Sequence, residues 1–331
     1  MNVNLLEIED LRVIYKTDED TIYAVNGVDM SVKNGETMGL VGETGAGKTT
    51  TALAIMKLLP ERTGFIKSGR ITLDGIDITR ATEHEMEAIR GNTVSMIFQD
   101  PMTSLNPTIT VGRQIAEVLQ LHEKSKSSSE MARSVDEMME LVGIPSHRKN
   151  EYPHQFSGGM KQRIVIAIAL ACKPKLLIAD EPTTALDVTI QDQVLEMMND
   201  LKERLGTSMI LITHDLGVVA QTCDTVAIMY AGEIIERGRV EEVFDTQIRH
   251  PYTSGLFGSI PNIKVTARRL NPIDGLMPDP ASPPDGCGFY ERCPKKMEMC
   301  GKKPPLFPTE GNGHAIRCWL HGDCARRGDG S

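Results

Sequence analysis

The stretch Gly42-Glu43-Thr44-Gly45-Ala46-Gly47-Lys48-Thr49 decides the fold, because it fits the phosphate-loop pattern G-x-x-x-x-G-K-[ST]. Strand-like residues 38–41 precede it and helix-like residues 50–56 follow it, as this loop requires. The glycines let backbone N–H groups surround anionic oxygens at the partially positive end of the helix. A glycine-rich turn with a surface lysine is the alternative reading. We predict a nucleotide site in which Lys48 meets the β- and γ-phosphates and Thr49 meets Mg²⁺, with these loop residues: Gly42, Glu43, Thr44, Gly45, Ala46, Gly47, Lys48, Thr49 and Thr50.

A nucleotide hydrolase also needs a strand that ends in acid, and Lys175-Leu176-Leu177-Ile178-Ala179-Asp180-Glu181 has this form. Asp180 is predicted to hold the metal. Glu181 follows just past the strand end, so it is the candidate general base that deprotonates water at the γ-phosphate. Adjacent acids also commonly begin a turn, and Pro182 follows here, so a plain turn is the alternative.

Between these two segments lies Phe156-Ser157-Gly158-Gly159-Met160-Lys161-Gln162-Arg163, followed by the apolar residues 164–172, which suit a buried helix. Ser157 stands where a helix N-cap is expected, and the two glycines leave the first helical amides open to an anion. The segment is therefore a second candidate for a phosphate contact.

In this position, Ser157-Gly158-Gly159-Met160-Lys161-Gln162 resembles the signature loop of the ATP-binding cassette (ABC) ATPases. Other residues match motifs of that family in the same order: Gln99 after the strand-like residues 94–98, Ala185-Leu186-Asp187 as the D-loop, and His214 after the strand-like residues 209–213. Tyr15 lies where the family keeps an aromatic ring that stacks on adenine, although Tyr23 is close by. Together the motifs cover residues from about 5 to 245.

The resemblance implies an α/β fold: a RecA-like core sheet with helices, a helical subdomain at about residues 100–160, and an antiparallel β part. It implies catalysis by Glu181, His214, Gln99 and Lys48, and Mg²⁺ binding by Thr49, Gln99 and Asp180. ABC cassettes close on ATP in pairs, so this chain, with one phosphate loop and one signature loop, is expected to dimerise. The residues expected to face the partner's nucleotide are Ser157, Gly158, Gly159, Gln162 and Asp187.

Composition sets the broad class. A formal charge of −9 disfavours a nucleic-acid binder, which would carry a basic stripe. Apolar runs stay well short of the ~18 residues needed to cross a bilayer, and the amino-terminal residues do not resemble a secretory leader. From about residue 246 the chain becomes mildly basic and takes most of its prolines, which disfavour helix and central strand. We predict a nucleotide-binding domain at residues 1–248 and a small loop-rich domain at residues 249–331.

Five of the seven cysteines lie in this second region, which indicates a metal or cluster site. The spacing C-x₅-C-x₆-C-x₁₇-C lacks the C-x₂-C pairs of most structural zinc sites and differs from the common ferredoxin patterns. Spacing alone therefore leaves zinc, an iron–sulfur cluster and free thiols open.

The tail also carries His250-Pro251-Tyr252-Thr253 and Gly286-Cys287-Gly288-Phe289-Tyr290-Glu291-Arg292-Cys293-Pro294, and Asp100-Pro101-Met102-Thr103-Ser104-Leu105-Asn106-Pro107 follows Gln99. Together these resemble the ATPase subunits of dipeptide and oligopeptide importers. The resemblance implies a 4Fe-4S cluster on Cys287, Cys293, Cys300 and Cys318, with Cys324 as the alternative fourth ligand. Because the cysteines lie far along the chain from Lys48 and Glu181, we expect the cluster to be structural and ATP binding to be independent of it.

The implied partners are a second ABC ATPase subunit, two transmembrane permease subunits at the cytoplasmic face of the plasma membrane and, indirectly, an extracytoplasmic peptide-binding protein. Three alternatives stay open. The solute could be nickel or another small solute. The chain could be a non-transport ABC ATPase, although no sustained heptad stretch for a coiled coil is present. Finally, the tail could be a redox or metal sensor.

Overall fold

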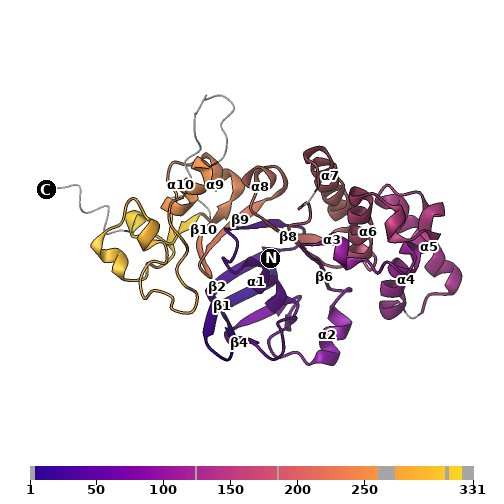
Figure 1. Cartoon of the computed structure of the whole chain (residues 1–331), viewed down its shortest axis with the longest axis horizontal. Helices are drawn as coiled ribbons and strands as arrows, with labels where there is room; N and C mark the ends of the chain where they lie inside the picture. The colour runs from indigo at the N-terminus through magenta and orange to yellow at the C-terminus, as the bar shows by residue number, and fades with distance from the viewer. Residues whose placement is uncertain (1–3, 124, 185, 260–272, 310–312, 323–331) are drawn as a thin grey trace.

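The computed structural model describes residues 4–123, 125–184, 186–259, 273–309 and 313–322 (Figure 1). Its centre is an eight-stranded sheet, within the described part of the chain, in the order β11-β12-β10-β9-β3-β8-β7-β6. The five strands from β9 to β6 are parallel, and each is short, apolar and almost wholly buried, as strands covered on both faces are. The bounds are β3 Thr37–Val41, β6 Val94–Ile97, β7 Leu176–Asp180, β8 Ser208–Thr213, β9 Thr225–Tyr230 and β10 Glu233–Arg239.

A second, antiparallel sheet has the order β2-β1-β4-β5 and covers helix α1 (Lys48–Ile55). Its strands alternate between buried apolar and exposed polar residues, which is typical of a sheet with one solvated face. The core beneath it joins Leu6, Val28 and Ile71 of this sheet to Ile55 of α1. The bounds are β1 Asn4–Lys16, β2 Thr21–Lys33, β4 Gly64–Leu73 and β5 Ile76–Asp77, with α2 (Glu83–Ile89) following. The expected antiparallel part of the fold is thus present.

Helices α4 (Val111–His122), α5 (Ser128–Leu141) and the start of α6 (Gly158–Leu170) form the expected helical subdomain around a second core, which includes Ile115, Val135 and Phe156. The polar composition of residues 123–129 predicts a solvated loop within this subdomain, and that prediction is wrong at its carboxyl end. Helix α5 begins at Ser128, because Ser127 and Glu130 form a capping box. The other helices in the described residues are α3 Pro101–Ser104, α7 Val188–Leu205, α8 Leu216–Thr222, α9 Val240–Asp245 and α10 Pro251–Gly258.

The carboxyl-terminal region, described from 249 to 259, 273 to 309 and 313 to 322, consists of α10, short 3-10 turns and the two-residue strands β11 (Phe307–Pro308) and β12 (Ala315–Ile316). This agrees with its proline content. Strand β12 pairs with β10, with Glu236 opposite Ile316, so the region extends the central sheet. A third core joins Tyr230 of β9 to Tyr252 and Phe289 of the carboxyl-terminal region. In Figure 1 this region and the helical subdomain lie at opposite ends of the molecule, with the central sheet between them.

The helices of the described residues do not include one with both the length and the apolar character to span a bilayer.

Candidate nucleotide site

The predicted phosphate loop joins the end of β3 to the start of α1, which begins at Lys48. At two positions of this loop only glycine fits, because a Cβ would collide with neighbouring backbone. A Cβ on Gly42 would lie 2.2 Å from the carbonyl oxygen of Met229, and one on Gly47 would lie 2.5 Å from that of Ala24. Gly47 also has φ +105°, which residues with a side chain rarely adopt. Neighbouring backbone on two sides therefore fixes the course of the loop.

Lys48 is 6% exposed, and its Nζ donates to the carbonyl oxygens of Gly42 at 2.7 Å and Glu43 at 3.0 Å. Burial lowers the pKa of Lys48, while the carboxylates of Glu181, Asp180 and Glu43 oppose that shift. A buried ammonium whose partners are loop carbonyls is suited to bind an anion placed in the same loop.

The predicted metal residues are brought together at the carboxyl edge of the parallel strands. The Oγ1 of Thr49 donates to Oδ2 of Asp180 at 2.8 Å, and Asp180 is 2% exposed. Burial raises the pKa of Asp180, and Glu181 adds to the shift, whereas Thr49 and Lys48 oppose it. A hydroxyl and a carboxylate oxygen this close fit Mg²⁺, which in nucleotide sites takes few protein ligands besides phosphate oxygens and water. Gln99, the third predicted ligand, donates from its Nε2 to the neighbouring Glu181 at 3.2 Å.

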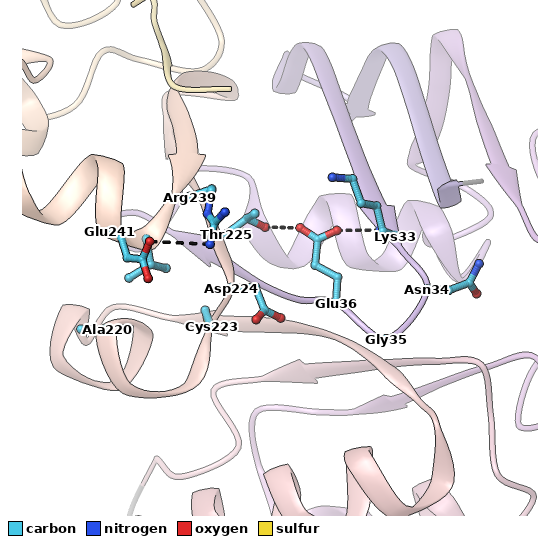
Figure 2. Close-up of a pocket in the computed structure, with 11 residues that line it drawn as sticks. Lys33, Asn34, Gly35, Glu36, Ala220, Cys223, Asp224, Thr225, Arg239 and Glu241 are labelled. Atoms are coloured by element: carbon cyan, nitrogen blue, oxygen red, sulfur yellow. Dashed lines mark hydrogen bonds and ion pairs between the residues drawn. The ribbon is translucent and has the colours of Figure 1, made fainter. Parts of the chain in front are cut away.

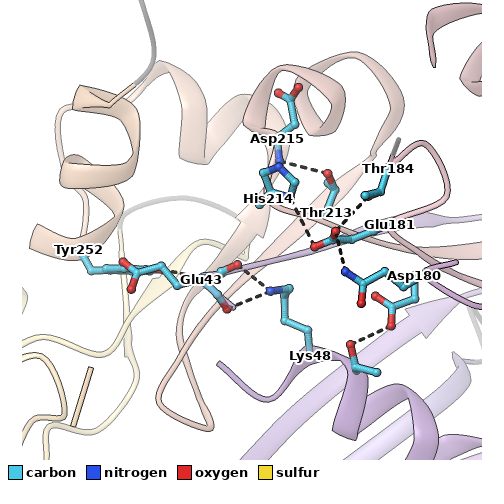
Figure 3. Close-up of polar contacts among 12 residues, drawn as sticks. Glu43, Lys48, Asp180, Glu181, Thr184, Thr213, His214, Asp215 and Tyr252 are labelled. Carbon is cyan, nitrogen blue, oxygen red and sulfur yellow. Dashed lines mark hydrogen bonds and ion pairs between the residues drawn. The ribbon is translucent and has the colours of Figure 1, made fainter. Parts of the chain in front are cut away.

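The Glu181 carboxylate contacts side chains from the segments that follow β6, β7 and β8 (Figure 3). Its Oε2 accepts hydrogen bonds from Nε2 of Gln99 at 3.2 Å and Oγ1 of Thr184 at 3.0 Å, and its Oε1 lies 3.4 Å from Nδ1 of His214. The backbone of Glu181 has φ +46°, and its N–H donates to Ile212 of β8 at 2.9 Å. Left-handed backbone in a residue with a side chain is costly and is found disproportionately at functional sites.

The two candidate adenine-stacking tyrosines have different surroundings. The hydroxyl of Tyr15 donates to Oγ1 of Thr50 in α1 at 3.3 Å, so this ring lies beside the phosphate loop and its helix. Tyr23 faces the carboxyl-terminal region, where its N–H donates to the carbonyl of Pro280 at 2.8 Å, and its ring lies under Lys67. The geometry therefore favours Tyr15 for a contact with a nucleotide.

The signature segment begins α6 as predicted. Ser157 is the N-cap and accepts a hydrogen bond from the N–H of Met160 at 3.4 Å, and nothing lies within 4 Å of a Cβ built on Gly158. Asp187, exposed, is the N-cap residue of α7, while Ala185 lies outside the described residues. The prediction that Gln162 faces a partner's nucleotide is wrong. Gln162 is fully buried and donates to the carbonyl of Pro182 within its own chain.

The four predicted cluster cysteines lie in one region. Burial raises the pKa of Cys287 to about 11 and that of Cys318 to about 12, and neighbouring thiols, those of Cys293 and Cys300 among them, add to both shifts. Among the described residues, however, no three histidine, cysteine or acidic side chains converge closely enough to hold a metal ion. The predicted 4Fe-4S site is therefore not supported by this arrangement, and Cys324 lies outside the described residues.

The structure also contains a contact that sequence reasoning missed. Arg292, the residue before Cys293, forms an ion pair with Glu43 of the phosphate loop at 2.9 Å. The cysteine region, although far along the chain from the phosphate loop, thus lies against it, and the independence of ATP binding from a cluster stays a prediction. No local pattern predicts such a contact, because 249 positions separate the two residues.

A cavity of about 670 Å³ lies elsewhere, at the opposite edge of the central sheet (Figure 2). It is lined by residues that precede β3 and β9, including Glu36 and Asp224. Glu36 accepts hydrogen bonds from the N–H of Lys33 and the hydroxyl of Thr225, and Asp224 accepts one from the N–H of Thr37. Ligands of open parallel sheets bind at the carboxyl ends of the strands, where Lys48 and Asp180 are, and not at this amino-terminal edge.

The fold and the site define the class: a P-loop cassette of the ABC type. The family described as "ABC transporter" matches residues 25–184, and the one described as "Oligopeptide/dipeptide transporter, C-terminal region" matches residues 235–300. Among solved structures, the cassette MJ0796, as a dimer in a post-hydrolysis state bound to ADP and Pi, is 26% identical with a TM-score of 0.63, covering 71% of this chain and 98% of the other. CbiO1 of Clostridium perfringens is 30% identical with the same TM-score, covering 74% and 92%.

Among curated proteins, the dipeptide transport ATP-binding protein DppD of Bacillus subtilis is 49% identical, over 96% of this chain and 94% of its own length. The oligopeptide transport ATP-binding protein OppD of the same organism is 50% identical, over 96% and 88%. The chain therefore belongs to the ABC transporter family of oligopeptide and dipeptide transport ATP-binding proteins, and it is an ABC-type ATPase.

Proposed function

We propose that this chain is the ATP-hydrolysing subunit of a di- or oligopeptide importer, bound peripherally to two permease subunits at the cytoplasmic face of the membrane. The main support is that Lys48, the Thr49–Asp180 contact and Glu181 meet at one edge of the sheet. The names of the dipeptide and oligopeptide transport relatives favour peptide over nickel or another solute. The match to the transporter carboxyl-terminal region disfavours a non-transport ABC ATPase.

In this proposal Glu181 is the general base. Water attacks the γ-phosphorus, its proton passes to the Glu181 carboxylate, and the bond from the γ-phosphorus to the oxygen of ADP breaks. Gln99 and His214, already within 3.4 Å of that carboxylate, orient it and the water. Lys48 binds the β- and γ-phosphates, and Tyr15 stacks on adenine. Thr49, Asp180 and Gln99 would hold Mg²⁺. Mg²⁺ would neutralise charge that develops on the phosphate oxygens.

The proposal includes a second cassette. Ser157 and Gly158, at the exposed start of α6, would contact the γ-phosphate held by the partner, and Asp187 would lie at the same interface. The dimeric, nucleotide-bound state of the similar cassette MJ0796 supports this arrangement. ATP would then act as an interfacial ligand whose cleavage reopens the pair and moves the permease subunits, which would contact the segment from Gln99 to Pro107.

We also propose that Cys287, Cys293, Cys300 and Cys318 bind a 4Fe-4S cluster, with zinc as the alternative. The support is that the four cysteines lie in one region, where burial and then neighbouring thiols raise the pKa of Cys287, Cys293 and Cys318. A bound cation would oppose that shift by stabilising the thiolates. Binding would draw the four side chains closer than they lie here. The cluster would serve as a cross-link for a region with little regular structure.

The substitution Glu181→Gln tests the ATPase proposal in the assembled transporter. It removes the base but keeps the size and the hydrogen-bonding edge of the side chain, so we expect turnover to fall by roughly 10²–10⁴-fold. ATP binding should persist, and the isolated chain should accumulate as an ATP-bound dimer, visible by size-exclusion chromatography. Glu137→Gln, an exposed position on α5, is the matched control and should leave both unchanged. Near-normal hydrolysis by Glu181→Gln would remove Glu181 from its role.

A further inference from the structure

The side chain of Arg292 donates as many hydrogen bonds as a guanidinium can, and these hold it in place. It is 6% exposed, although it belongs to a loop-rich region. Its Nε donates to the carbonyl of Asp274 at 2.9 Å, and its two terminal nitrogens donate to the carbonyl of Ile273 at 3.1 Å, the hydroxyl of Tyr230 at 3.2 Å and both carboxylate oxygens of Glu43 at 2.9 and 3.2 Å. These contacts use all five N–H donors of a guanidinium. The forked pair with Glu43 is the geometry in which arginine binds a carboxylate most strongly.

The backbone of Glu43 is held from the same direction. Its N–H donates to the hydroxyl of Tyr252 at 3.0 Å, and Tyr252 is fully buried. Figure 3 shows Glu43 between Tyr252 on one side and Lys48 on the other. The Tyr252 ring packs on those of Tyr230 and Phe289, with centroids 4.6 and 5.5 Å away. The first turn of the phosphate loop is thus anchored to the carboxyl-terminal region by its backbone and by its side chain.

The negative charge of Glu43 lies close enough to Lys48 to affect the binding of phosphates. Three carboxylates, those of Glu181, Asp180 and Glu43, act on the ammonium of Lys48. Asp180 and Glu181 have proposed tasks with Mg²⁺ and water, but Glu43 has none, and an unpaired carboxylate here would repel the phosphates of ATP. Arg292 is the cation that pairs with it. Because the pair is partly shielded from water, its effect on a neighbouring anion is screened less than that of a surface pair.

We propose that Arg292 is a positioning residue of the nucleotide site: it neutralises Glu43 and holds the first turn of the phosphate loop in its binding geometry. The residue comes from the carboxyl-terminal region, so a segment far along the chain from the phosphate loop helps to set nucleotide affinity. The inference rests on the proposed ATP function, and its test separates the two.

The test is a double-substitution cycle on the full chain, with affinity for MgATP measured by displacement of a fluorescent ATP analogue. Arg292→Gln leaves Glu43 unpaired, and we expect it to weaken ATP binding on the order of tenfold, less at high salt. Glu43→Gln leaves the arginine as an unpaired cation, so it should tighten binding. Glu43→Gln combined with Arg292→Gln should return the affinity close to that of the wild type, because neither charge remains. Arg292→Lys, which keeps the charge but loses the fork, should fall between wild type and Arg292→Gln.

A role in stability alone would give a different pattern. Arg249 is the matched control: it also donates to backbone carbonyls, of Val243 and Phe244, and stacks on the ring of Phe257, but it has no partner in the phosphate loop. Arg249→Gln should lower the melting temperature without changing ATP affinity. The proposal is overturned if folded Arg292→Gln binds ATP like the wild type, or if Glu43→Gln does not restore its affinity.

Two further outcomes are informative. If Arg292→Gln does not fold, the single variant Glu43→Gln is the test, since the Glu43 side chain is about one-third exposed. Tighter ATP binding by that variant supports the proposal, and unchanged or weaker binding overturns it. Lys48→Ala separates this inference from the proposed function. If it binds ATP as the wild type does, the ATP site itself is misassigned; if it loses ATP while folded Arg292→Gln keeps it, only the role of Arg292 fails.

Discussion

Replacing Gly42 with alanine should disable the nucleotide site through a single added methyl group. The new Cβ would lie 2.2 Å from the carbonyl oxygen of Met229, whereas a carbon and an oxygen in contact stay about 3.3 Å apart or more. The loop and strand β9 must therefore separate by about 1 Å. A misplacement of about 1 Å costs on the order of 10²-fold in rate, or about 2.7 kcal/mol of transition-state stabilisation. Overpacking adds about 1–3 kcal/mol of lost stability.

The assay is steady-state ATP hydrolysis by the assembled transporter, with thermal unfolding of the isolated chain to show that the variant is folded. Gly258→Ala is the control, because nothing lies within 4 Å of a Cβ at that position near the end of α10. It should keep full activity and gain up to about 1 kcal/mol of stability. The steric reasoning would be refuted if Gly42→Ala hydrolysed ATP within about threefold of the wild type.

Two more predictions concern the carboxyl-terminal region. Burial, with repulsion from His321, lowers the pKa of His250 from 6.5 to about 3, so the unfolded chain takes up a proton that the folded chain does not, and stability is lost as pH falls below 6.5. The free energy of unfolding should drop by about 1 kcal/mol between about pH 6.5 and 5.5. The variant His250→Asn, whose side-chain oxygen can replace Nδ1 as the acceptor for the N–H of Tyr252, should flatten that slope in denaturant titrations; an unchanged slope would argue against His250. Protein prepared without oxygen should be brown with about four irons per chain, and Cys293→Ser should bleach it; one zinc and no iron would contradict the cluster.

The parts of the fold that could be predicted are those with a local cause. The glycines of the phosphate loop predict the path of its backbone, because no other residue fits at Gly42 and Gly47. The apolar runs before Gly42, Asp180 and His214 became the buried parallel strands β3, β7 and β8. Because parallel strands share a carboxyl edge, the residues after them meet there whatever the connections between them are.

The errors have physical reasons too. Polar composition suggested that residues 123–129 were a loop, but Ser127-Ser128-Ser129-Glu130 contains the S-x-x-E spacing of a capping box, and this signal outweighs composition at a helix start. Gln162 was predicted to face a partner because its neighbours in the signature segment resemble residues that do so in the ABC family. Along α6, however, it lies about one and a half turns on from Ser157 and therefore faces the buried side of the helix.

The link between the carboxyl-terminal region and the phosphate loop was beyond sequence reasoning, because it depends on how a region with little regular structure docks. That docking has a definite cause. Strand β12 adds to the sheet beside β10, and Glu236 of β10, fully buried, is satisfied by His314 at 2.9 Å and by the N–H of His250 at 2.8 Å. A buried carboxylate without such partners would be strongly unfavourable, so these contacts fix the region on the cassette. Once it is fixed there, Arg292 lies within reach of Glu43, and the first turn of the phosphate loop depends on a segment that its own sequence neighbourhood does not contain.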